Sequence, residues 1–227
     1  KPVVAKGDKV KVGTLIAEAG GFVSAPIYSS VSGTVFKVDT SIDATGYRKP
    51  CIIINVEGDE WEESIDRSDK LETLEAHTEL TPEEIVNRIK VAGVTGMGGA
   101  GFPTFIKLCP PPGAKAECVI INGVECEPYI TADYRLMMEH ADEILVGLNL
   151  LMKAAKVEKG YIGIEDNKPA AIKLFEEKTA NDSRIEIVPL AKKYPQGGEK
   201  QLVDAVIRRQ VPAPPAIPVN VGAIVQN

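Results

Sequence analysis

The segment GMGGAGFPT, residues 96–104, carries four glycines among its first six residues. Glycine lets the backbone pass close to a ligand and adopt positive φ angles. Consecutive N–H groups in such a loop can point at an anion, and a helix that begins behind the loop adds its positive end. Pro103 suits the first turn of that helix, because no N–H is needed there. The segment therefore predicts a phosphate-binding loop, with a glycine hinge between domains as the alternative.

The same glycines fit the dinucleotide fingerprint G-x-G-x-x-G through Gly96, Gly98 and Gly101. That fingerprint requires a strand in front of it. Residues 81–92 instead predict a helix, because a threonine cap and a proline precede acidic residues and apolar residues at helical spacing. We therefore reject an ordinary Rossmann nucleotide site and keep the phosphate loop.

The composition limits the possible partners. The chain has 227 residues, a net charge of −6 and no basic cluster, so we expect no nucleic-acid partner. No apolar run approaches the roughly 20 residues that span a bilayer, so we expect no transmembrane segment. The four cysteines lack C-x-x-C spacing, so we expect neither an iron–sulfur cluster nor a zinc site in this chain. The chain starts without methionine and stops in mid-pattern, which predicts a fragment truncated at its C-terminus.

Residues 1–57 predict a small all-β domain, since short apolar runs alternate with glycine turns. The pattern V-x-x-G-D-x-V-x-x-G at residues 4–13 resembles the barrel-sandwich hybrid fold of biotinyl and lipoyl carrier domains. A working carrier needs a lysine at an exposed hairpin tip, and residues 20–23, where that tip is expected, contain none. We therefore favour a structural role over a carrier role. Residues 58–80 are acidic and polar and predict a solvated connector.

Residues 81–227 predict an α/β domain with a largely parallel sheet, because helical and strand patterns alternate along them. The chain as a whole is then α+β, with a Rossmann-like α/β domain behind the β domain. The expected strands are residues 117–122, 160–165 and 184–190, and the expected helices are residues 104–108, 131–156, 169–179 and 198–209.

Ligands of open α/β sheets bind at the carboxyl ends of strands. One such end is NGVECEP, residues 122–128. Asn122 offers both a donor and an acceptor, which suits the edge of a flavin ring. Glu125 or Glu127 suits ribose hydroxyls or an amide group. The alternative is an acidic turn that caps the following helix.

Two further strand ends contain glycines or a polar residue. Residues 194–200, YPQGGEK, have paired glycines and place Glu199 at a helix start. Residues 218–221, PVNV, place Asn220 on a strand after a proline turn. Lys107 lies one turn into the helix behind the glycine loop, where it can reach a phosphate or a ring carbonyl.

The residues indicate no catalytic group and no metal ligand. A thiol nucleophile at Cys126 is disfavoured, because activation needs an electropositive setting and this turn is acidic. The candidate cofactor-binding residues are Gly96, Gly98, Gly99, Ala100, Gly101, Phe102, Lys107, Asn122, Glu125, Glu127, Tyr194, Glu199 and Asn220.

Taken in their order along the chain, these motifs resemble those of a known family. The glycine loop with Lys107 looks like the flavin loop of the NADH-oxidising flavoprotein subunit of respiratory complex I, and residues 122–128 are similar to that family's Asn-x-x-Glu-x-Glu-Pro turn. The segment from Tyr194 to Glu199 is similar to its Tyr-x-x-Gly-Glu-Glu segment, and Asn220 with Val221 to its Asn-Asn-Val. The barrel-sandwich unit points instead to the RnfC-type subunit of the Rnf electron-transport complex.

The resemblance implies a non-covalent FMN held by the glycine loop and NADH that passes a hydride to it. It also implies that electrons leave singly through two [4Fe–4S] clusters in a region missing from this chain. The FMN contacts it implies are Asn122, Glu125, Lys107 and Asn220, and the NADH contacts are Phe102, Glu127 and Glu199. Gly198 and Val124 depart from the complex I pattern, which has acids at those positions.

The implied activity is that of an NADH:acceptor (ferredoxin) oxidoreductase subunit in an ion-translocating complex. Its partners would be NADH and the other subunits of a membrane electron-transport complex, and it would lie peripherally at the cytoplasmic face of the bacterial cell membrane. Three alternatives stay open: a cobalamin-reducing flavoprotein, a non-catalytic docking or carrier subunit, and a structural subunit with a vestigial flavin loop.

Overall fold

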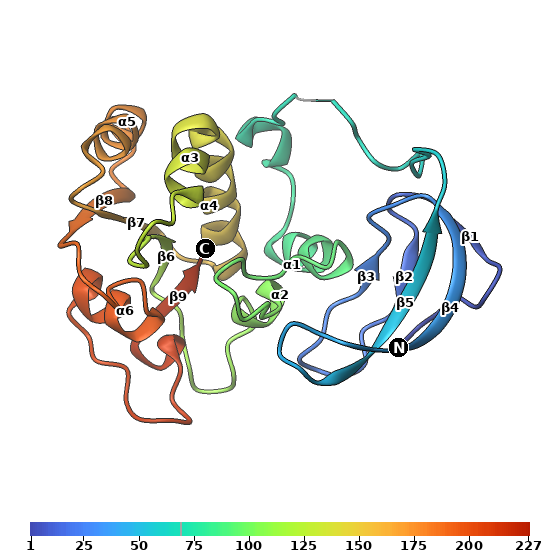
Figure 1. The fold of residues 1–227 in the computed structure, drawn as a ribbon. Coiled ribbons are helices and arrows are strands. Elements are labelled where there is room, and N and C mark those ends of the chain that lie inside the picture. The colour runs from blue at the N-terminus through green and yellow to red at the C-terminus, as the bar shows by residue number, and fades with distance from the viewer. Residues whose placement is uncertain (69) are drawn as a thin grey trace. The chain divides into compact units, whose positions relative to one another are not determined.

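The computed structural model describes residues 1–68 and 70–227, which form two compact units (Figure 1). The first unit contains Lys1–Lys70 and Ile89–Thr95, and the second contains Leu71–Arg88 and Gly96–Asn227. The domain boundaries expected after residues 57 and 80 stay predictions.

The first unit is built from antiparallel strands, as its alternating runs and turns predict. β4 pairs with both β1 and β5 in a three-stranded sheet, and β2 pairs with β3 in a second sheet. Buried Val10, Ile16 and Val35, which come from both sheets, form its core. β3 has only two residues, too few for an alternation signal, and the sequence does not predict it. The strands are β1 (Lys9–Val10), β2 (Leu15–Ala17), β3 (Ile27–Tyr28), β4 (Gly33–Ile42) and β5 (Arg48–Val56).

The second unit contains a four-stranded sheet in which all neighbouring strands are parallel, in the order β8-β7-β6-β9 (Figure 1). The sequence predicts β6 and β7 because strands buried on both faces read as continuous apolar runs, and it also predicts the edge strand β8. It does not predict the position of β9. The strands are β6 (Cys118–Gly123), β7 (Lys159–Glu165), β8 (Ile185–Leu190) and β9 (Ala223–Gln226).

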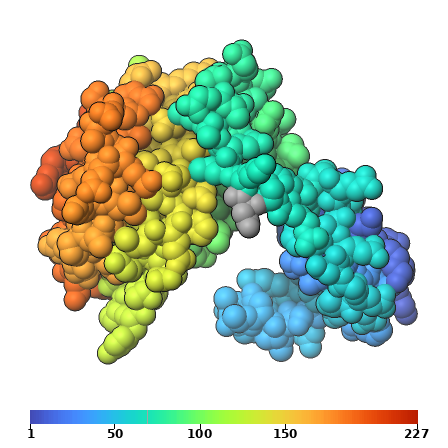
Figure 2. Space-filling view, turned by 90° about the horizontal axis from the view of Figure 1, so that it is seen from above, coloured from blue at the N-terminus to red at the C-terminus, as the bar shows by residue number. Residues whose placement is uncertain are grey.

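Helices cover both faces of this sheet. One layer contains α3, α4 and α5, which contact β6, β7 and β8, and its outer surface is yellow and orange in Figure 2. The opposite face is covered by α6, which contacts β6, β7 and β9 (Figure 1). The helices are η1 (Leu74–His77), α1 (Pro82–Val91), α2 (Thr104–Lys107), α3 (Ala132–Glu139), α4 (Ala141–Ala155), α5 (Pro169–Thr179), α6 (Glu199–Ile207) and η2 (Pro218–Val221).

The structure corrects two expectations about these elements. The long helix expected at residues 131–156 is two helices, because His140 has φ −129° and ψ 35°, outside the helical region. Asp142 and Glu143 follow in the first turn of α4, and acids favour a helix start. Asn220 lies in η2 and not on a strand; the strand begins only at Ala223.

Within residues 1–68 and 70–227, no helix combines the length and the apolar character needed to cross a bilayer.

Candidate functional site

A cavity of about 600 Å³ opens in the second unit at the edge of the sheet where β6 and β9 end. Four parts of the chain line it: the glycine loop with α2, the turn after β6, the segment that leads into α6, and the end of the chain from residue 217. Several predicted site residues come together here, namely Gly96, Gly98, Ala100, Gly101, Phe102, Lys107, Asn122, Glu127, Tyr194 and Glu199.

The glycine loop is closed by a hydrogen bond in which the Gly96 N–H donates to the Phe102 carbonyl over 2.8 Å. Gly99 has φ +97° and Gly101 has φ +60°, values that side-chain-bearing residues rarely adopt. A Cβ at Gly98 would lie 2.7 Å from the Asn227 Oδ1 atom. Gly99 and Gly101 therefore serve the conformation of the turn, whereas Gly98 packs closely against the side chain of Asn227, directly after β9. Gly99 belongs to the loop but does not line the cavity.

Helix α2 behind the loop is a single turn of four residues. A helix dipole of this length is weak, because the effect sums over aligned peptide units. An anion in the loop would therefore depend on the backbone N–H groups of the loop and on a nearby cation.

Lys107 is the cation of the cavity. Its Nζ atom donates to the Glu199 Oε1 atom and to the Val225 carbonyl, each over 2.8 Å. It also lies 6.0 Å from the centre of the Phe102 ring. One ammonium group thus joins α2, α6, β9 and the glycine loop at the edge of the cavity.

Asn122 is the penultimate residue of β6 and also lines the cavity. Its Nδ2 atom donates to the Gly197 carbonyl over 2.9 Å, and its Oδ1 atom accepts from the Val124 N–H over 3.2 Å. The Gly197 N–H in turn donates to the Cys126 Sγ atom over 3.4 Å. These contacts fix the turn after β6 against the segment before α6.

Glu125 does not reach the cavity. Its carboxylate is buried and accepts from the N–H groups of Asp133 and Tyr134, over 2.8 and 3.1 Å. Glu125 therefore caps α3, as the capping alternative describes, and the expected flavin contact at Glu125 stays a prediction.

Asn220 also lies away from the cavity, at the amino end of β9. Its Oδ1 atom accepts from the Ile217 N–H over 2.8 Å, and the residue lines a separate depression with Lys115 and Arg209. The carboxyl end of β9 is formed by Gln226, with Asn227 directly after it, and the expected flavin contact at Asn220 stays a prediction.

Sequence reasoning missed these last two residues. Asn227 lines the cavity beside Gly98. Buried Gln226 donates from its Nε2 atom to the Thr104 Oγ1 atom over 2.6 Å. Its Oε1 atom has no partner within the described residues, and such an acceptor is characteristic of a site completed by a ligand or water. The signal available in the sequence was a polar pair directly after the apolar run at 223–225.

The fold and the cavity define an α/β domain with a cavity at the carboxyl edge of a parallel sheet, joined to a small antiparallel β unit. Residues 89–227 match the family model described as the Nuo51 FMN-binding domain, and the chain belongs to this family. Residues 1–59 match the RnfC barrel sandwich hybrid domain.

Curated relatives share both parts. The C subunit of the Na⁺-translocating ferredoxin:NAD⁺ oxidoreductase complex of Acetobacterium woodii is 44% identical over 227 residues, which are 100% of this chain and 50% of the relative. The C subunit of the proton-translocating ferredoxin:NAD⁺ oxidoreductase complex of Clostridium ljungdahlii is 45% identical over 100% of this chain and 48% of the relative. The chain thus spans about half the length of these relatives.

A solved structure has a similar fold. The crystal structure of the NAD⁺-reducing [NiFe]-hydrogenase in its H₂-reduced state gives a TM-score of 0.56 at 26% identity. The similarity covers 64% of this chain and 28% of the hydrogenase chain.

Proposed function

We propose that the second unit holds FMN in the cavity and that the chain takes part in the oxidation of NADH. The observation that carries this proposal is the meeting of a glycine loop, Lys107 and Asn122 around one cavity of about 600 Å³. These parts suit a phosphorylated, planar cofactor with a polar edge. Membership of an FMN-binding family and the names of the relatives support the same assignment.

Each polar part of FMN has matching residues in the cavity. The backbone of residues 98–101 would receive the phosphate group, because these residues offer N–H groups and carry no side chain larger than a methyl group. Lys107 would add a positive charge, and charge-assisted hydrogen bonds are the stronger kind. Asn122 and Asn227 would bond polar groups of the cofactor from two sides of the cavity.

Bound FMN supplies the ring chemistry that accepts a hydride and passes electrons on singly. The chain supplies orientation. Glu127 and Glu199, which line the cavity, would accept hydrogen bonds from the ribose or amide of NADH, and Phe102 would lie against a flat ring. Ile106, Ile217 and other apolar lining residues would limit the access of water.

The wider setting is part of the proposal. We infer that the chain serves an ion-translocating electron-transport complex, as the complexes named for its relatives do. Its partners would be the other subunits, and [4Fe–4S] clusters beyond the residues of this chain would receive the electrons. The site would be peripheral to the membrane, on its cytoplasmic face.

The test is a titration of the purified chain with FMN, followed by NADH without oxygen. We expect saturable quenching of flavin fluorescence, and then bleaching of the flavin absorption when NADH is added. Riboflavin, which lacks the phosphate, should bind about 100-fold more weakly, since two or so charge-assisted hydrogen bonds are lost. Equal affinities for FMN and riboflavin, or an unchanged spectrum with NADH, would contradict the proposal.

A further inference from the structure

A buried ion pair lies behind the turn that carries Glu127. The Lys168 Nζ atom is 3.3 Å from the Glu125 Oε2 atom, and the two side chains are 14% and 1% exposed. The same ammonium group lies 5.0 Å from the centre of the Tyr134 ring on α3. Lys168 thus contacts both the turn after β6 and the first turn of α3.

Three donors already engage Glu125 in this arrangement. Its two oxygens accept the Asp133 and Tyr134 N–H groups and the Lys168 ammonium group. A buried carboxylate of this kind is stable only while its partners stay in place. Glu125 therefore fixes the start of α3 relative to the end of β6.

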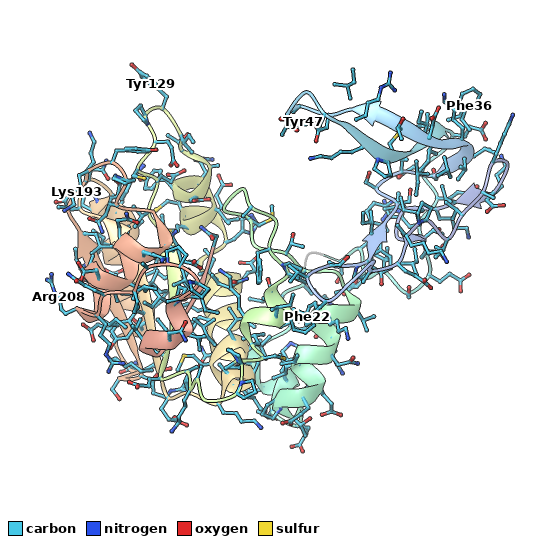
Figure 3. All side chains as sticks on the ribbon, turned by 90° about the horizontal axis from the view of Figure 1, so that it is seen from below. Phe22, Phe36, Tyr47, Tyr129, Lys193 and Arg208 are labelled. Atoms are coloured by element: carbon cyan, nitrogen blue, oxygen red, sulfur yellow. The ribbon has the colours of Figure 1, made fainter. Side chains whose placement is uncertain are left out.

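The segment between these two anchors is held at its start by Cys126, whose Sγ atom accepts from the Gly197 N–H, whereas its tip has little support. Tyr129 at its tip is fully exposed, has φ +70° and is directed away from the helices (Figure 3). A bulky residue with positive φ is strained and packs against nothing here. The position of Glu127 at the cavity, two residues before Tyr129, therefore depends on the Cys126 contact and on Glu125 with its partners.

Glu165 ends β7 and faces the same group of charges. It is 1% exposed, and its Oε1 atom has no hydrogen-bond partner among the described residues. Burial, the largest cause, raises the pKa of Glu165. Lys168 and Lys192 lower this pKa, whereas Glu125 and Asp166 raise it further.

We propose that Lys168 is a positioning residue for the rim of the cavity, and that Glu165 competes with Glu125 for its ammonium group once Glu165 loses its proton. The effect on a nucleotide at Glu127 rests on the proposed function; the effect on α3 does not. While Glu165 is neutral, Lys168 stays on Glu125 and the turn is held. When Glu165 ionises, one ammonium group faces two buried carboxylates, and the start of α3 loosens.

Burial favours the neutral form of Glu165 in the folded protein, and this preference sets the sign of the pH effect. Folding stability is greatest below the ordinary pKa of glutamic acid, and it decreases as the pH rises from there through the raised pKa of Glu165. The affinity for a nucleotide decreases over the same pH range, because Glu127 is no longer held in position at the cavity there.

The experiment measures the affinity of the FMN-loaded full chain for NAD⁺ between about pH 5 and about pH 9, a range that begins just above the ordinary carboxyl pKa. In the wild type the affinity should fall about tenfold with rising pH, whereas Glu165→Gln should keep the low-pH affinity throughout. Lys168→Met should bind about tenfold more weakly at every pH. Lys173→Met, at a 76% exposed position on α5, is the matched control and should behave as the wild type.

A second readout follows the Asp133 and Tyr134 amides by hydrogen exchange, comparing variants at the same pH. Their protection should fall in Lys168→Met and should become independent of pH in Glu165→Gln. Asp133 also has a pKa raised by burial, so Asp133→Asn is included and should keep the pH dependence. If these amides follow the predicted pattern but no variant binds NAD⁺, the proposed function fails and the positioning role stands. An unchanged pH profile in Glu165→Gln, unchanged protection in Lys168→Met, or a profile abolished by Asp133→Asn overturns the positioning proposal.

Discussion

Gly99→Asp should abolish FMN binding, with a loss of at least about 100-fold in affinity. Gly99 has φ +97°, and nothing lies within 4 Å of the position that a Cβ atom would take, so an aspartate fits into the loop without a clash. Its carboxylate would then add a negative charge to the loop that is proposed to bind the phosphate and would repel that group. Fluorescence titration with FMN measures the effect.

Gly7→Asp provides the matched control. Gly7 has φ +96°, also has nothing within 4 Å, and lies in the first unit. Both substitutions introduce about 1–3 kcal/mol of backbone strain. Only Gly99→Asp should lose FMN. Wild-type affinity in Gly99→Asp, or an equal loss in Gly7→Asp, would mean that the loop does not hold the phosphate.

Phe175→Ala should lower the free energy of unfolding of the second unit by about 3–5 kcal/mol. Phe175 lies on α5 and is completely buried, so its removal leaves a cavity between this helix and the sheet. Urea unfolding followed by circular dichroism measures the change.

Leu136→Ala, on the exposed side of α3 in the same unit, is the control for this experiment. Leu136 is 50% exposed, so its loss should cost well under half as much as that of Phe175. Equal effects of the two substitutions would contradict the packing of α5 described above.

The parts of the fold that the sequence predicts are those set by local patterns. Helix α5 has the predicted bounds, because a proline starts Pro169–Thr179 and a buried strand precedes it. Strands β6 and β7 are recognisable as apolar runs because both faces of a parallel sheet are covered. The glycine loop is recognisable because its glycines serve a backbone conformation, which residue type alone can indicate.

The parts that the sequence does not predict depend on contacts between distant residues. A carboxylate after a strand can face the cavity or turn back to cap the next helix, and Lys168, 43 positions along the chain, favours the second for Glu125. The end of β9 is set by its pairing with β6, where Ile121 lies opposite Gln226. Sequence reasoning therefore favours Asn220 over Asn227, since no local pattern places a four-residue strand after a proline-rich turn.

A crystal structure of the FMN-bound chain would show directly whether the glycine loop holds the cofactor. We predict the phosphate within hydrogen-bonding distance of the backbone at residues 98–101, and a polar group of the ring system at Asn122. FMN bound at any other place on the chain, or a glycine loop that stays packed against its neighbours while FMN is present, would contradict this assignment.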